Sequence, residues 1–194
     1  MIGKKLNNYI WGVWFLLLMP MAIGAQADEV TPHGVVEEVT IELVDVIVEH
    51  QASFEQNPEA FYQALDGVLN EAIDFDWIAY NVMGPYRKKA TDEQRQRFSE
   101  KFRRNLIETY GGGLAAFGDQ KIVVLPPSEN IEGKRLVRVD QEIHGAEGVY
   151  PLQYSMGLNS KGVWKVTNVI INGVNLGKTF RNQFLQRAQK FGGD

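Results

Sequence analysis

The hydrophobic pattern of this chain changes its period once, near Lys121. Before that position, apolar residues recur every three or four positions, as they do on one face of an α-helix. After it, apolar and polar residues alternate, as they do on a β-strand that buries one face. A run of helices followed by a run of strands predicts an α+β domain, with helices against one face of an antiparallel sheet.

Capping signals place the starts of the helices. Thr31-Pro32 and Asn57-Pro58 each combine an N-cap residue with a proline at the first helical position. A capping box at Thr91 precedes a stripe of apolar, mostly aromatic residues at a spacing of four. The predicted helices run from Pro32 to about Gln51, from Pro58 to Leu69, from Asp74 to Val82, and from Thr91 to a stop at Gly111–Gly113.

Turn residues divide the second part of the chain into strands. The first three are predicted at 122–125, 134–144 and 149–159. A β-branched strand that starts at Trp164 follows them, and it ends in an Asn-Gly turn. A polar helix over about 177–190 then completes the domain, because its aromatic residues recur at helical spacing.

Residues 1–27 have the layout of a secretory signal peptide. Lys4 and Lys5 precede an apolar run over 9–23, which is shorter than the roughly 20 residues of a membrane span. We expect cleavage after Ala27, which leaves a single domain over 28–194; an uncleaved anchor helix is the alternative. A signal-bearing chain without a cysteine for acylation predicts a protein that is free in a bacterial periplasm.

The sequence shows no motif of a reactive site. It has no cysteine, its three histidines do not follow a metal-binding spacing, and no serine lies in Gly-x-Ser-x-Gly. Asp74 and Asp76 are two positions apart on a predicted helix and so do not share a face. We therefore expect no catalytic residue, no metal, no cofactor and histidines at the surface. An enzyme would need a constellation that sequence spacing does not display.

Basic residues cluster in an otherwise acidic chain. The formal net charge of −4 disfavours nucleic acid as a partner. Arg87-Lys88-Lys89 nevertheless starts a basic stretch that continues along the fourth predicted helix. It is either a solvated helix face or a contact for an acidic partner or an anionic head group, since such charge steers encounter. The candidates for this contact are Arg87, Lys88 and Arg104.

Three blocks of the chain carry a family resemblance. The first runs from Phe75-Asp76-Trp77-Ile78 to Tyr86, the second from Ala90-Thr91 to Tyr110, and the third over 164–184. In this order they resemble the MlaC-type periplasmic phospholipid-binding proteins, also called the toluene-tolerance auxiliary family of ABC transporters. The chain departs from the family at Arg87, where a second aromatic residue is common.

The resemblance implies helices packed on one face of a curved antiparallel sheet, with an apolar cavity between them. It implies a soluble carrier that moves phospholipids across the periplasm and so maintains outer-membrane lipid asymmetry. Its partners would be an outer-membrane lipoprotein complex and an inner-membrane ABC transporter complex with a lipid-binding substrate domain. The absence of reactive motifs suits a protein that encloses acyl chains without changing them.

Apolar residues of the sheet, of the helix after Thr91 and of the first resemblance block are the candidates for the cavity wall. The expected lining consists of Val82, Met83, Tyr86, Phe102, Leu106, Tyr110, Val139, Ile143, Leu152, Tyr154, Val166, Ile170 and Val174. We expect Arg181 and Phe184 to hold the last helix in place rather than to touch a ligand.

Other functions are compatible with the same pattern. The chain could bind a different hydrophobic ligand, such as a sterol-like or aromatic compound. A hydrolase or isomerase on a similar cone-shaped α+β fold would need a polar pair inside the cavity. A pure interaction protein would have a filled core and would release no ligand on extraction.

Overall fold

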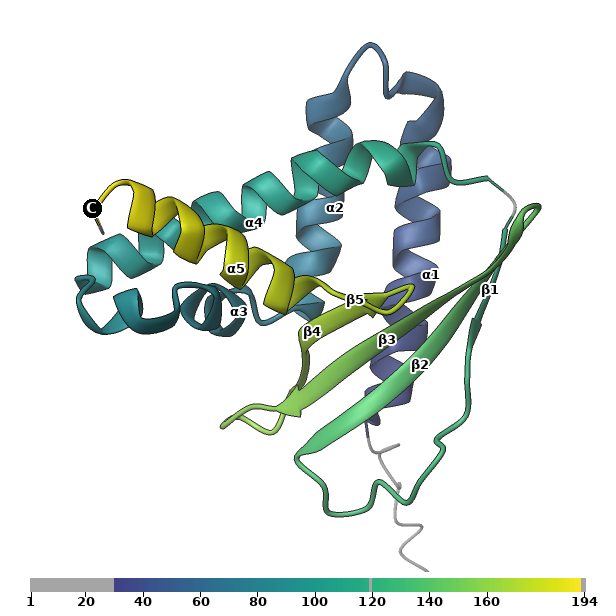
Figure 1. The fold of residues 1–194 in the computed structure, drawn as a ribbon. Helices are drawn as coiled ribbons and strands as arrows, with labels where there is room; N and C mark the ends of the chain where they lie inside the picture. The colour runs from purple at the N-terminus through teal and green to yellow at the C-terminus, as the bar shows by residue number, and fades with distance from the viewer. Residues whose placement is uncertain (1–29, 119, 193–194) are drawn as a thin grey trace, which may run out of the picture.

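The computed structural model describes residues 30–118 and 120–192. In these residues, five α-helices pack with a five-stranded antiparallel sheet that curves around the N-terminal part of the first helix (Figure 1). The α+β architecture expected from the change in period is confirmed. The predicted signal peptide, residues 1–27, lies outside the described residues.

Each predicted helix is present. The helices are α1 (Pro32–His50), α2 (Pro58–Ala72), α3 (Phe75–Val82), α4 (Asp92–Ala115) and α5 (Leu176–Lys190), with the 3₁₀ turns η1 (Gln51–Ser53) and η2 (Gly84–Lys88). No described helix is both long enough and apolar enough to cross a membrane.

The predicted caps determine where the helices begin. Thr31 Oγ1 accepts a hydrogen bond from the Gly34 amide at 3.0 Å at the start of α1. At the start of α4, Thr91 Oγ1 accepts from the Gln94 amide, and Gln94 Oε1 accepts from the Thr91 amide. This reciprocal pair is the predicted capping box, and a cap of this kind stabilises a helix by about 1 kcal/mol.

The predicted stop of α4 at its triple glycine is wrong. The helix continues through Gly111–Gly113 to Ala115. Gly111 is buried where α4 crosses α2, and any side chain there would meet Tyr62 and Leu65. The glycine therefore serves a close helix–helix approach, and the packing energy offsets the low helix propensity of glycine.

The strands follow each other in the sheet in chain order. They are β1 (Lys121–Val124), β2 (Leu136–Gly145), β3 (Gly148–Leu158), β4 (Trp164–Ile171) and β5 (Val174–Asn175), and every neighbouring pair is antiparallel. The predicted turn at Asn172-Gly173 joins β4 and β5 with positive φ at both residues, 49° and 78°. This geometry is that of a type I′ hairpin, for which Asn-Gly is the preferred sequence.

A β-bulge interrupts β4. Ser155 pairs with Asn168 while Met156 pairs with Val166, so Thr167 has no partner in β3. The Thr167 hydroxyl donates to the Ser155 carbonyl at 2.9 Å and holds the extra residue in place. A bulge adds one residue to a strand and thereby reverses the alternation of faces beyond it.

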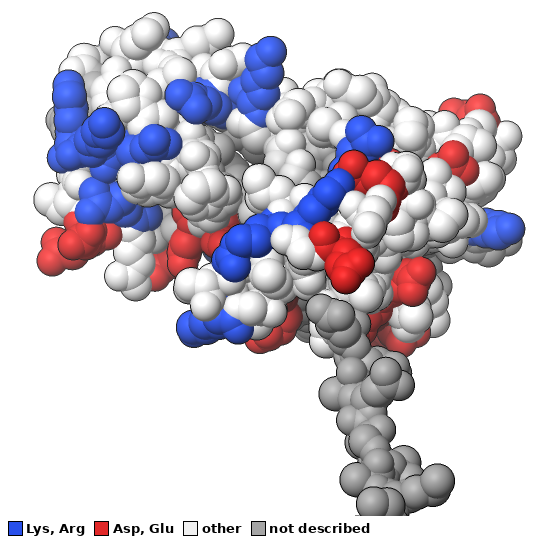
Figure 2. Space-filling model, turned by 90° about the horizontal axis from the view of Figure 1, so that it is seen from below, with Lys and Arg blue, Asp and Glu red and all other residues white. Residues whose placement is uncertain are grey.

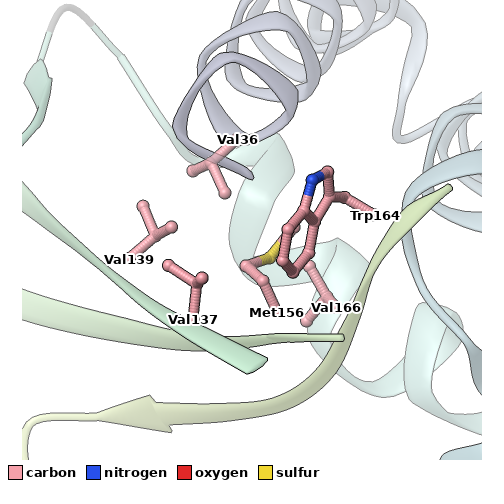
Figure 3. Close-up of a cluster of buried hydrophobic side chains, with 6 residues drawn as sticks. All are labelled: Val36, Val137, Val139, Met156, Trp164 and Val166. Carbon is pink, nitrogen blue, oxygen red and sulfur yellow. The ribbon is translucent and has the colours of Figure 1, made fainter. Parts of the chain in front are cut away.

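In the part of the chain that the structure describes, the buried hydrophobic residues form two separate clusters. The first lies between the start of α1 and the sheet, where six side chains point toward one another (Figure 3): Val36, Val137, Val139, Met156, Trp164 and Val166. The second lies where α1, α2 and α4 meet, and it contains Ile47, Phe61, Leu65 and Ile107. Each cluster includes residues of α1, so this helix connects the two.

Candidate functional site

An apolar cavity of about 410 Å³ lies between the two core clusters. Its size falls within the range of small-molecule sites. The helical wall is formed by Val35, Val36, Val39, Thr40, Leu43, Val44, Ile47, Leu65, Leu69, Ala72, Phe75, Ile78, Leu106, Ile107, Tyr110, Gly111, Gly113, Leu114, Leu176, Gly177 and Phe180. The sheet contributes Ile122, Gln141, Ile143, Leu152, Tyr154, Val166, Asn168, Val169 and Ile171, and the connecting segments add Ile73 and Phe117.

The structure brings six of the predicted lining residues together on the cavity wall. They come from α4 and from three strands, and they are Leu106, Tyr110, Ile143, Leu152, Tyr154 and Val166. On the sheet they lie on the same face because Gln141 pairs with Leu152 and Val139 with Tyr154, and alternate residues of each strand share a face. Their contact with a ligand stays a prediction.

Seven predicted lining residues lie elsewhere: Val82, Met83, Tyr86, Phe102, Val139, Ile170 and Val174. Val82 and Met83 are buried at the end of α3, and Val139 is buried in the first core cluster. Val174 is 52% exposed after the β4–β5 turn.

Ile170 is missing from the wall because of the bulge at Thr167. Strict alternation from Val166 would place Ile170 on the same face. With the extra residue, Val169 and Ile171 take that face, opposite Tyr154 and Leu152. A bulge of this kind cannot be recognised from hydrophobic periodicity. The predicted place of Ile170 in the cavity wall is therefore corrected only by the structure.

Phe102 and Tyr86 belong to an aromatic seam between α4 and α5. The seam is built from edge-to-face pairs, Phe102 with Phe180 at 5.5 Å, Phe98 with Phe184 at 5.1 Å, and Tyr86 with Phe184 at 6.0 Å between ring centroids. Such pairs add about 0.5–1.5 kcal/mol each beyond the area they bury. The seam fixes α5 on α4, which agrees with the role expected for Phe184.

Sequence reasoning missed the contribution of the first and the last helix to the wall. Val35, Val39 and Leu43 of α1 line the cavity, as do Leu176 and Phe180 at the start of α5. The available signal was the apolar stripe of α1, which is unusually rich in Val and Ile for a helix. Nothing in the stripe distinguishes a cavity wall from a packed core.

One polar chain crosses the wall. Tyr154 donates through its hydroxyl to Gln141 Oε1 at 2.7 Å, Gln141 Nε2 donates to Thr40 Oγ1 at 2.7 Å, and Thr40 donates to the Val36 carbonyl at 2.6 Å. Gln141 is only 3% exposed. Burial raises the pKa of the Tyr154 hydroxyl, because the charged phenolate is poorly solvated there. The chain connects α1 to β2 and β3 with its polar groups satisfied.

Within the described residues, the wall contains no Asp, Glu, His, Lys, Arg, Ser or Cys. No group of three metal-ligating side chains occurs in the part of the chain that the structure describes. Asp74 Oδ1 accepts from the Trp77 amide as the cap of α3, and Asp76 accepts from the Ser99 hydroxyl at 2.6 Å. These carboxylates therefore hold helices in place outside the cavity.

One histidine departs from expectation. His33 is buried at the start of α1 and not at the surface. Burial lowers its pKa, while Glu37 and Asp140 act in the opposite sense. His144, by contrast, is partly exposed and lies 2.9 Å from Glu142.

The predicted basic contact residues divide into two groups. Arg104 is paired with Glu59 at 3.1 Å and with Glu108 at 2.6 Å on the outside of α4 and α2. Arg87 lies in η2, where its guanidinium stacks over the Tyr80 ring at 4.6 Å, and the neighbouring Lys88 is exposed. The three residues therefore do not form one site.

Comparisons with known proteins agree on one family. The family described as "MlaC protein" matches residues 37–194. The toluene tolerance protein ttg2D of Pseudomonas putida is 43% identical over 166 residues, which cover 84% of this chain and 76% of that protein. The intermembrane phospholipid transport system binding protein MlaC of Haemophilus influenzae is 24% identical over 176 residues, 89% of this chain and 81% of that protein.

A solved structure has the same fold. The phospholipid-binding protein from Ralstonia solanacearum, solved in complex with a phospholipid, superposes with a TM-score of 0.78 at 26% identity. The match covers 84% of this chain and 90% of that one.

Proposed function

The chain belongs to the MlaC protein family, and from this premise we propose that it is a phospholipid carrier of the periplasm. It would be exported by the signal peptide in residues 1–27 and would enclose the acyl chains of a phospholipid in the cavity between α1, α4, α5 and the sheet. The observation that carries the proposal is an apolar cavity in the fold of a phospholipid-bound relative.

The energetics of lipid transfer explain why such a cavity is needed. Each methylene taken out of water contributes about 0.8 kcal/mol, so two acyl chains with roughly thirty methylenes contribute about 24 kcal/mol. A lipid cannot cross water at a useful rate with that surface exposed. A carrier has to cover the tails with apolar side chains and can leave the charged head group in water.

The chemistry of the wall supports a binding protein and not an enzyme. Apart from Tyr110 and the internally bonded groups of Thr40, Gln141, Tyr154 and Asn168, the side chains that line the cavity are apolar. None of these can serve as a general acid or base near neutral pH in the way that a carboxylate or imidazole does. The cavity therefore suits a ligand that is bound and released without chemical change.

The family premise also supplies the partners. We infer that the protein receives and delivers phospholipid at an outer-membrane lipoprotein complex and at an inner-membrane ABC transporter complex with a lipid-binding substrate domain. This exchange would maintain the lipid asymmetry of the outer membrane. The name of the relative from Haemophilus influenzae, an intermembrane phospholipid transport system binding protein, supports this role.

Extraction of the purified protein tests the proposal. We expect mass spectrometry of an organic extract from protein made in a bacterial host to show about one phospholipid for each folded molecule. A sterol-like or aromatic compound in its place would favour a carrier for another ligand. A protein that yields no lipid and takes up none from vesicles would contradict the proposal and favour an interaction protein.

A further inference from the structure

Two large aromatic side chains project from the outer face of α3. Trp77 is 52% exposed and Tyr80 is 39% exposed, while Phe75, Ala79 and Val82 occupy the buried face of the same helix. Neither of the two rings lines the cavity. They are not grouped with either core cluster, so packing within the described residues does not account for them.

Three cations follow α3 in the chain, and two of them contact an aromatic ring. Arg87 stacks over Tyr80 with its guanidinium carbon 4.6 Å from the ring centroid, and Lys89 Nζ lies 5.9 Å from the centroid of Tyr86. Lys88 and Lys89 are exposed. Among the described residues, neither Arg87 and Lys88 of η2 nor Lys89 just after it forms an ion pair with a carboxylate. We call Trp77, Tyr80, Arg87, Lys88 and Lys89 the α3–η2 surface.

Three of the four arginines of α4 differ from these cations because each forms an ion pair; Arg97 is exposed and forms none among the described residues. Arg95 pairs with Asp92, Arg103 with Asp66 at 3.1 Å, and Arg104 with two glutamates. The only acidic residue of α3 itself, Asp76, is hydrogen-bonded by Ser99. The positive charges of Lys88 and Lys89 therefore remain available for an external partner, whereas the partly exposed Arg87 stacks on Tyr80 and donates to Asn81 Oδ1.

The end of α5 extends the basic region. Arg181 lies against Gly84 at the start of η2, and the last turn of α5 carries Arg187 and Lys190. In Figure 2 many Lys and Arg side chains lie on the left part of the molecule, the side on which η2 and the end of α5 lie in Figure 1, with some Asp and Glu side chains below them and more Lys and Arg side chains across the middle. Helix α1, whose sequence contains five acidic residues, lies toward the other side of Figure 1. The field of the molecule therefore presents its basic end to an anionic surface, although the whole chain is acidic.

The combination of residues indicates the kind of partner. Trp and Tyr are preferred at the boundary between the head groups and the acyl chains of a bilayer, where a ring has one apolar and one wet side. Lys and Arg next to such rings are attracted by anionic lipid, at about a five-fold gain in binding for each side chain.

We propose that the α3–η2 surface docks this protein on the surface of an anionic phospholipid bilayer. The inference rests on the proposed function, since a lipid carrier has a reason to approach a membrane. It goes beyond that function because it names the surface and the lipid charge. The aromatic seam connects docking to the cavity: Tyr86 of η2 packs on Phe184, one helical turn beyond Phe180 in the cavity wall.

Vesicle flotation tests the proposal on the full exported protein. We expect binding to vesicles of phosphatidylglycerol with phosphatidylcholine, weaker binding at high salt, and little binding to phosphatidylcholine alone. Lys88→Gln combined with Lys89→Gln should weaken binding by about 30-fold. The matched control is Lys121→Gln with Lys161→Gln, which removes the same charge at exposed positions of the sheet and should change binding less than about two-fold.

Tryptophan fluorescence gives a second, independent measurement. Residues 28–194 contain two tryptophans, Trp77 and the buried Trp164. With anionic vesicles we expect a blue shift of the emission, because Trp77 leaves water, and we expect the shift to vanish in Trp77→Phe. Trp164 serves as the internal reference, since it is buried with or without vesicles.

The outcomes separate this inference from the proposed function. A protein that yields phospholipid on extraction but neither binds anionic vesicles nor shifts its emission would overturn the docking surface and leave the carrier intact. Equal binding by the Lys88/Lys89 variant and its control would overturn it as well. If the unchanged protein binds no anionic vesicles but the Lys88/Lys89 variant loses lipid exchange with a partner protein, the surface is a protein interface and the inference is wrong.

Discussion

At the scale of single residues, Leu106 and Ile170 separate the cavity from its surroundings. Both have aliphatic side chains and both belong to the predicted lining, but only Leu106 reaches the wall. We expect Leu106→Trp to fill part of the cavity and to weaken lipid binding by about 10-fold or more, the equivalent of about 1.4 kcal/mol of overpacking. The measurement is the phospholipid-to-protein ratio in an organic extract, followed by uptake from vesicles.

Ile170→Trp is the matched control for that substitution. Beyond the bulge at Thr167, this side chain points away from Tyr154 and Leu152. The variant should therefore keep the lipid load of the unchanged protein. A loss of lipid in Ile170→Trp equal to that in Leu106→Trp, with both proteins folded, would contradict the register of β4 described above.

Tyr154 makes a second prediction at this scale. Its hydroxyl is the partner of buried Gln141, so Tyr154→Phe leaves a carbonyl oxygen without a donor. We expect the free energy of unfolding to fall by about 1–2 kcal/mol in urea titrations. Tyr150→Phe on the same strand removes a hydroxyl from an exposed ring and should cost less than about 0.5 kcal/mol. Equal effects of the two substitutions would show that the polar chain contributes nothing.

The same residue makes stability depend on alkaline pH. The pKa of Tyr154 is raised in the folded protein, whereas the pKa of a tyrosine in the unfolded chain is about 10. Below that pH both states keep the proton and the contribution is constant. Above it the unfolded chain releases the proton first, so the free energy of unfolding falls as pH rises. Unfolding titrations between about pH 9 and 11 should show a smaller decline for Tyr154→Phe than for the unchanged protein.

At the scale of elements, the crossing of α2 and α4 depends on a residue that looked like a helix stop. A methyl group on Gly111 would lie about 3.0 Å from Leu65 and 3.1 Å from Tyr62. Gly111→Ala gains up to about 1 kcal/mol of helix propensity but has to push two packed helices apart. We expect a net loss of about 1 kcal/mol in the free energy of unfolding, measured by urea titration.

Gly67 provides the comparison within α2. Its α-carbon has open space around it, with no atom within 4 Å of an added methyl group. Gly67→Ala should therefore raise the free energy of unfolding by up to about 1 kcal/mol. If Gly111→Ala proved as stabilising as Gly67→Ala, the close approach of the two helices would not constrain residue 111.

Most helices, strands and turns could be predicted from the sequence. The features that could not be predicted differ from them in a physical respect. Caps and turns depend on neighbouring residues, so Thr91, Asn57 and the turn at Asn172 reveal themselves in sequence. The bulge at Thr167 and the role of Gly111 depend on partners far along the chain. Local periodicity carries no information about such contacts. For this reason the predictions that Ile170 lines the cavity and that α4 stops at its triple glycine were both wrong.

At the scale of the whole molecule, the candidate site was only partly predictable. The sheet side of the cavity followed from alternation, because a strand with one apolar face shows which side chains point inward. The helical side did not, since an apolar stripe looks the same against a cavity as against a core. Phe102 illustrates this limit: it belongs to the right stripe of α4, but α5 covers it.

The distribution of charge is also a property of the whole molecule. Acidic side chains on α1 and basic ones on η2 and the end of α5 give the protein two unlike ends, although its net charge is small. The net charge alone argues against an anionic surface as a partner. The separation of charge across the fold argues for an anionic surface as a partner. This separation becomes visible only in the tertiary structure.

The cavity wall is closed by the two ends of the described chain. α1 forms one side, and the last element, α5, contributes Leu176, Gly177 and Phe180. During synthesis the N-terminus emerges first, so the wall stays incomplete until the final helix has formed and packed on α4. Binding competence therefore comes last in the life of each new molecule. Under the proposed export, a chain whose last helix has not yet crossed the membrane would lack the α5 part of its lipid-binding wall.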